Sequence, residues 1–206
     1  MRRTLGVAGV AAAALIGSAE AADAHIVASR LGDLYAGALH PLTDLQDLIL
    51  WIALGVLAGS LGPAKGRWLV PVFPLGLGAG LLLGLASGVA SAGPVADAGM
   101  ILVMGLLIAA EMRMPATLLC AIALGLALIR GAANAGGVGP ETSWLLFATG
   151  LASAGYVAIT LIMGLTVAFR GADAAPSMTW RSIATRALGS WIAAIGLMMG
   201  GFAFAA

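Results

Sequence analysis

The sequence predicts an all-α membrane protein, a bundle of about six transmembrane helices that follows a cleaved signal peptide. Of its 206 residues 61% are hydrophobic and only 9% are charged, whereas a soluble domain carries roughly a quarter charged residues. The 30 glycines are spread through the apolar runs, and helices in lipid pack through small residues that allow close backbone approach. These observations indicate that the lipid bilayer surrounds this chain and that its helices form a compact bundle.

The first 24 residues have the pattern of a secretory signal peptide. Arg2 and Arg3 precede an apolar stretch over residues 5–16, which is too short to span a bilayer. Two small-x-small cleavage sites follow, at residues 19–21 and 22–24. Cleavage would place the mature amino terminus outside the cytoplasm and leave residues 25–206 as one six-helix transmembrane domain. The alternative is an uncleaved first helix that has acidic residues at its end.

Six uncharged apolar runs follow in the mature chain. Three are shorter than the roughly 20 residues that a perpendicular span requires. Their helices must therefore include flanking residues such as Asp44, Asp47, Pro94 or Arg130, which brings ionisable groups to membrane depth. The runs cover residues 48–62, 68–89, 98–110, 115–129, 143–169 and 187–206.

The charge distribution predicts the topology. With an even number of spans and an external amino terminus, the loops at 63–67, 111–114 and 170–186 are cytoplasmic. They hold six Lys and Arg residues against two, Arg30 and Arg130, in the external segments, as the positive-inside rule requires. We therefore expect a protein of the bacterial inner membrane with both mature termini in the periplasm.

Five carboxylates fall on the predicted outer side of the membrane. An acidic outer face would raise the local cation concentration, although carboxylates in loops also serve simply as solvated groups. The five are Asp33, Asp44, Asp47, Asp97 and Glu141.

Polar residues precede the first span in the segment DLYAGALHPLTDLQD, residues 33–47. Pro41 suits the first position of a helix, which would make His40 its cap, and Asp44 and Asp47 are three apart and share a face. One imidazole and two carboxylates could bind a divalent cation, because imidazole suits nickel, cobalt, copper and zinc. Alternatively, Asp44 interacts with the positive end of the helix and Asp47 hydrogen-bonds a neighbouring helix.

His25 is a second candidate metal ligand. Cleavage after Ala24 would make it the first residue, where its amine and imidazole could chelate a metal together; the alternative is a solvated terminal histidine. The one cysteine, Cys120, excludes a disulfide framework and a cysteine metal cage. The sequence holds no basic block for nucleic acid and no nucleotide loop or hydrolase motif, so we expect neither an enzyme nor a bound cofactor.

Glycines repeat every four residues in three of the apolar runs, and each repeat forms one helical face. We expect these faces to pack against other helices, within the chain or in a homo-oligomer or a larger membrane complex. The repeats are Gly55 and Gly59, then Gly76, Gly80, Gly84 and Gly88, then Gly196 and Gly200.

Three segments carry a family resemblance. HPLTDLQDLILWIALGVLAG, residues 40–59, resembles the first-helix signature of the HupE/UreJ proteins, His-Pro-x-x-Gly-x-Asp-His before an apolar run. GLLIAAEMRMPATLLCAIALGLALIRGAANAGG, residues 105–137, is similar to the family's third and fourth spans with the following loop, and GYVAITLIMGL, residues 155–165, to its fifth span. The resemblance implies a cleaved signal, six spans and the uptake of nickel or cobalt for urease or hydrogenase assembly.

The sequence departs from this family at its histidines. Asp44 replaces the glycine of the first-helix motif, Gln46 its aspartate and Asp47 its second histidine. The family loop His-Gly-His-Ala-His-Gly aligns with residues 130–135, which begin with Arg130, a group that would repel a dication, and Gly164 stands where the fifth span usually has histidine.

Two functional hypotheses therefore remain. The first is a secondary transporter or permease for a divalent metal ion, with His40, Asp44 and Asp47 at its external entrance. The second is a diverged accessory or structural subunit that kept the bundle and lost the substrate site. They differ in whether His40 and Asp47 meet polar groups of other helices around a cavity.

Overall fold

The computed structural model describes residues 32–88, 92–171 and 180–205, and all regular elements in these ranges are helices. This confirms the predicted all-α class. The predicted signal peptide and His25 lie outside the described residues. In chain order the elements are a helix over Gly32–Thr43, α2 Leu45–Ser60, α3 Pro63–Gly66, α4 Leu69–Ser87, α5 Pro94–Ala109, α6 Ala116–Asn134, the 3-10 turn η1 Ala135–Gly137, α7 Trp144–Arg170 and α8 Trp180–Ala205.

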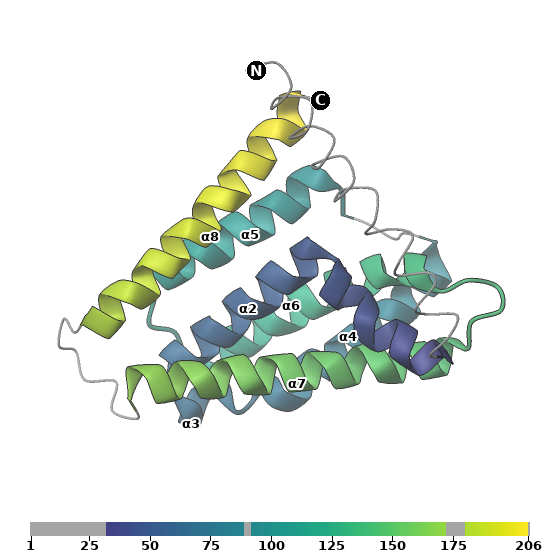
Figure 1. Cartoon of the computed structure of the whole chain (residues 1–206), viewed down its shortest axis with the longest axis horizontal. Coiled ribbons are helices and arrows are strands. Elements are labelled where there is room, and N and C mark those ends of the chain that lie inside the picture. Colours follow the sequence, from purple (N-terminus) through teal and green to yellow (C-terminus); the bar gives the residue numbers. More distant parts are fainter. Residues whose placement is uncertain (1–31, 89–91, 172–179, 206) are drawn as a thin grey trace, which may run out of the picture.

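Each of the six apolar runs lies on a helix, which confirms a polytopic bundle (Figure 1). In the described part of the chain, four helices are long and apolar enough to cross a membrane, and the helix Gly32–Thr43 with α2 makes a fifth if that bent pair is one span. Helix α5 is apolar but has only 16 residues. The count of six spans therefore stays a prediction. The expected inclusion of flanking residues is confirmed, because Asp47 lies inside α2 and Arg130 inside α6.

The chain turns by 80° between the helix Gly32–Thr43 and α2. The prediction that Pro41 begins a helix capped by His40 is wrong: both residues lie inside the first of these helices, and the N-cap of α2 is Asp44. Asp44 Oδ1 accepts a hydrogen bond of 2.8 Å from the Gln46 backbone N–H. A short carboxylate can satisfy such a free N–H in the first turn of a helix, so the bend forms at Asp44.

Glycine faces hold the helices together inside the chain. A Cβ atom on Gly80 would collide with the Leu128 backbone of α6, and one on Gly131 of α6 would collide with the Leu77 carbonyl of α4. Gly76 and Gly84 also face α6, which confirms the predicted packing face for these glycines, whereas Gly88 ends α4 in the left-handed conformation at φ 70°, and a Cβ atom there would meet no described residue within 4 Å. The predicted packing faces are thus used within one chain.

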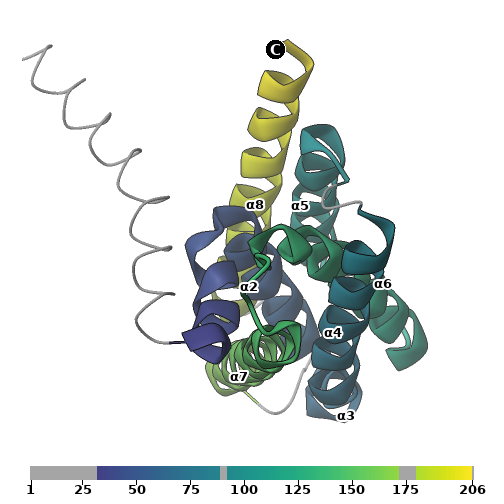
Figure 2. The ribbon, with the colours of Figure 1, turned by 90° about the vertical axis from the view of Figure 1, so that its right-hand side faces the viewer.

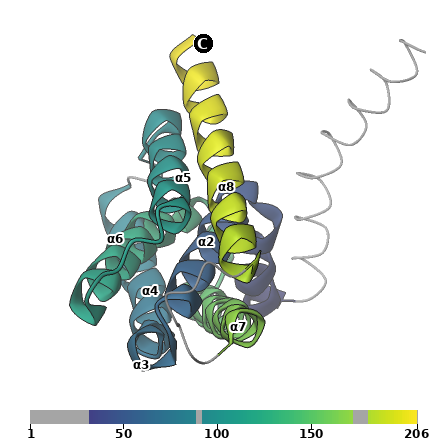
Figure 3. The same cartoon turned by 90° about the vertical axis from the view of Figure 1, so that its left-hand side faces the viewer.

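Helices α5 and α8 form a second closely packed pair. Cβ atoms on Gly105, Gly189 and Gly196 would each meet backbone atoms of the opposite helix. The two helices lie side by side and rise together away from α7 (Figures 2 and 3). Large apolar side chains on the outside of the molecule are exposed, among them Leu75 and Phe202. Such a surface matches a protein that has lipid around it.

The three loops predicted to be cytoplasmic meet at one end of the bundle. Lys65 Nζ donates to the Met114 carbonyl at 3.0 Å, which joins the first loop to the second. Arg170 Nη2 and Ser182 Oγ both donate to Glu111 Oε1, at 2.8 and 2.7 Å, which joins the second to the third. The Ser182 hydroxyl and then the Arg170 guanidinium lower the pKa of the Glu111 carboxyl.

Candidate cation site

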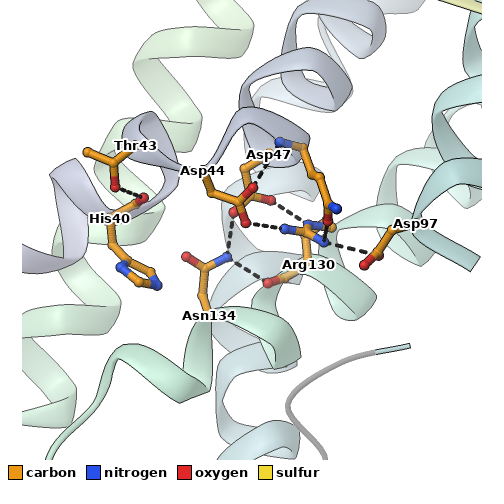
Figure 4. Close-up of polar contacts among 8 residues, drawn as sticks. His40, Thr43, Asp44, Asp47, Asp97, Arg130 and Asn134 are labelled. Atoms are coloured by element: carbon orange, nitrogen blue, oxygen red, sulfur yellow. Dashed lines mark hydrogen bonds and ion pairs between the residues drawn. The ribbon is translucent and has the colours of Figure 1, made fainter. Parts of the chain in front are cut away.

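A single arginine lies among three carboxylates inside the helix bundle (Figure 4). Arg130 Nε is 2.6 Å from Asp47 Oδ1, its Nη2 is 2.7 Å from Asp44 Oδ2 and its Nη1 is 3.1 Å from Asp97 Oδ1. Nη1 also lies 3.3 Å from Gln46 Oε1. The guanidinium therefore donates to side chains of both α2 and α5 from α6.

Helix starts account for the positions of the carboxylates. Asp44 and Asp47 lie at the N-cap and first turn of α2, and Asp97 lies in the first turn of α5. The free N–H groups and the dipole of a helix favour negative charge there. The sequence expectation that Asp44 and Asp47 share a face is confirmed, because both contact Arg130.

The cluster is buried on one side and open on the other. The side chains of Asp47, Arg130 and Asp97 are 0%, 3% and 8% exposed, whereas that of Asp44 is 39% exposed. Asp47 and Asp97 are therefore not part of a solvated acidic surface. Asp44 is the member of the cluster that an ion from solution would meet first.

Asn134 extends the polar cluster by one helical turn. Its Nδ2 donates to Asp47 Oδ2 at 2.8 Å and to the Arg130 carbonyl at 2.7 Å. These two bonds require the amide nitrogen on that side. Asn134 Oδ1 is buried and has no hydrogen-bond partner in the structure, and it lies on the side of the amide that faces His40 (Figure 4). A buried acceptor without a partner is rare in folded proteins and calls for an explanation.

His40 approaches the cluster from the other side of the bend. Its ring lies 5.9 Å from that of Phe147, centroid to centroid. A Cβ atom on Gly137 of η1 would lie 3.0 Å from its Nε2 atom. The helix Gly32–Thr43 thus places His40 against η1 and α7, with Asn134 between it and the carboxylates (Figure 4).

The charges in this cluster do not balance. Three carboxylates and one guanidinium leave a formal charge of −2 when all are ionised. In the described part of the chain no three His, Cys, Asp or Glu side chains lie close enough together to hold a metal ion. The Arg130 guanidinium occupies the space among the three carboxylates.

Comparison with known proteins identifies the family of the chain. The family model described as HupE / UreJ protein matches residues 13–199. The chain belongs to the HupE/UreJ family. It is 33% identical over 144 residues to Protein HupE of Rhizobium leguminosarum bv. viciae, an alignment that covers 69% of this chain and 71% of the relative. No solved structure matches the chain.

The HupE/UreJ motifs of the sequence pointed to part of the site. His40, Asp44 and Asp47 lie in its first-helix motif and Arg130 in its loop motif. Asp97 and Asn134 were missed as site residues. The sequence spacing could have identified Asn134, because it follows Arg130 by four residues at the end of an apolar helix and so lies on the same face of that helix.

Proposed function

We propose that this chain is a permease of the bacterial inner membrane for a divalent metal ion, and that the ion passes the carboxylates around Arg130. The HupE/UreJ family is associated with nickel or cobalt transport and with accessory functions in hydrogenase and urease systems. This association makes nickel or cobalt the ion that we propose for this chain. The mature protein would begin near His25 and have both termini in the periplasm, with six spans.

The convergence of Asp44, Asp47 and Asp97 from two helix starts carries this proposal. Ionisable side chains inside membrane helices are costly, and where they occur they commonly line the path of an ion or substrate. Here the carboxylates outnumber the guanidinium three to one. An apolar bundle that served only as a scaffold would have no need of this excess negative charge.

The ligand chemistry supports a divalent ion that accepts oxygen donors. His40 supplies an imidazole, which suits nickel and cobalt, and Asn134 Oδ1 offers a buried carbonyl oxygen without a partner. Asp44 provides the accessible end of this path. His25 would be an additional ligand at the mature amino terminus.

A specific observation favours the accessory or structural subunit as a second candidate. Arg130 fills the space among the carboxylates, and it pairs with all three of them. A cluster closed in this way could serve only to hold α2, α5 and α6 together. The desolvation cost of burying these charges would then be offset by the role of the cluster in specifying one arrangement of the three helices.

Flux of nickel, cobalt, copper and zinc into proteoliposomes separates the two candidates. We expect the unmodified protein to move at least one of the four ions, and Asp47→Ala and His40→Ala to remove most of that flux. Met104→Leu, a change of a buried core side chain outside the cluster, serves as the matched control. If the unmodified protein moves none of the four ions, the accessory role replaces the permease.

A further inference from the structure

The Arg130 guanidinium fills the centre of the carboxylate cluster. Its three nitrogens each donate to a different carboxylate, at 2.6, 2.7 and 3.1 Å, and its side chain is only 3% exposed. A cation that approached Asp47 would meet a fixed positive charge within hydrogen-bond distance of the same oxygens. Two cations at this separation repel strongly where little water screens them.

The carboxylates are spaced for the guanidinium rather than for a bare ion. Arginine presents its N–H groups in a planar fork, and the three carboxylates are arranged around that fork, each with an oxygen 2.6–3.1 Å from a different guanidinium nitrogen. The described residues accordingly include no group of three direct metal ligands. Removing the guanidinium would leave space for an ion that keeps some of its water.

Asn134 gives an independent sign that the cluster is built for a ligand. Asn134 is 2% exposed, yet its Oδ1 has no partner in the structure while its Nδ2 makes two hydrogen bonds. A buried carbonyl oxygen is an acceptor that a cation or its bound water can use. The same amide binds Asp47, the most buried of the carboxylates, through Nδ2, while its Oδ1 lies on the side that faces His40 (Figure 4).

We propose that Arg130 is a tethered cation that competes with a mobile divalent ion for Asp44, Asp47 and Asp97. In the conformation described, the guanidinium holds the site closed, and an ion binds tightly only when the guanidinium moves away. Arg130 is thus the residue that sets the affinity of the site. This inference rests on the proposed function for the kind of ion, but it concerns binding and not flux.

Calorimetric titration of CoCl2 into the purified full chain in detergent tests the competition. We expect Arg130→Gln to bind cobalt at least about tenfold more tightly than the unmodified protein, because a positive charge next to the ion is removed. The double variant Arg130→Gln with Asp47→Asn should lose this gain. The matched control is Arg113→Gln, which removes an exposed charge elsewhere and should leave the affinity unchanged.

Free guanidinium provides a second measurement on the same variant. Guanidinium chloride at millimolar concentration should weaken cobalt binding to Arg130→Gln more than sodium chloride does at equal ionic strength. An equal or weaker cobalt affinity of Arg130→Gln, relative to the unmodified protein, overturns the proposal.

If Arg130→Gln does not fold, Arg130→Met decides, because methionine is also a long, unbranched side chain but carries no charge. A higher cobalt affinity supports the competition, and an unchanged affinity overturns it. Tight cobalt binding by either variant, together with an absence of flux in the unmodified protein, would retain this inference while the permease fails.

Discussion

Arg130 Nε lies 2.6 Å from Asp47 Oδ1, although the two residues are 83 positions apart in the chain. The pair joins α6 to the first turn of α2, and Asp97 extends the link to α5. Three helices that contribute apolar faces to the core therefore also share one buried network of charges. Removal of any member should affect both the stability of the bundle and the electrostatics of the site.

Asp47→Asn should destabilise the protein by about 1.5–3 kcal/mol, the usual contribution of a hydrogen bond to a charged group. The loss is not larger because Arg130 keeps Asp44 and Asp97 as partners. The free energy of unfolding in mixed micelles measures it, with Glu141→Gln as the exposed control. In a double-mutant cycle, Arg130→Gln should cost less in the Asp47→Asn background than alone. If the two changes in the free energy of unfolding are additive, the Arg130–Asp47 ion pair does not contribute to stability.

Gly80→Ala should lower the melting temperature in detergent clearly, because a Cβ atom there collides with the α6 backbone at Leu128. Gly78→Ala is the matched control on the same helix, since a Cβ atom at this position meets nothing within 4 Å. Its melting temperature should stay the same or rise, because alanine favours a helix by about 1 kcal/mol over glycine. Equal effects of the two changes would show that α4 and α6 are not in close contact in the membrane.

Cysteine labelling tests the topology. In a Cys120→Ala background, a probe at Gly139 should react with an impermeant maleimide added outside intact spheroplasts. A probe at Ala64 should react only after permeabilisation. Both positions are exposed and belong to opposite predicted sides of the membrane. The reverse pattern of labelling would overturn the predicted orientation.

Glu111 should make the stability of the loop cluster depend on pH. Its pKa is lowered in the folded protein by Ser182 and Arg170, so its contribution is present above the ordinary glutamate pKa and is lost as the pH falls through the lowered value. The melting-temperature difference between the unmodified protein and Glu111→Gln should therefore be largest near neutral pH and shrink in acid. A difference that stays constant with pH would contradict this assignment.

The sequence predicted the helices well and the site only in part. Apolar runs and a glycine repeat are local patterns, so α4, α6 and close packing at Gly80 could be anticipated, but the identity of α6 as the partner helix could not. Asp97 and Arg130 are 33 positions apart in the chain, and no local sequence pattern predicts that α5 and α6 bring their side chains together. The bend at Asp44 was also hidden, because proline is favoured in the first turn of a helix and disfavoured in its interior, so Pro41 indicated a helix start although it lies inside the short helix that precedes the bend.

The most direct measurement of the central claim compares metal flux in two variants with the same chemical change. Asp97→Asn removes a buried carboxylate of the cluster, and Glu141→Gln removes an exposed one outside it. In proteoliposomes at matched protein levels, Asp97→Asn should lose most of the nickel or cobalt flux, while Glu141→Gln should keep the flux of the unmodified protein. Equal flux through both variants would contradict the claim that the carboxylates around Arg130 form the path of the ion.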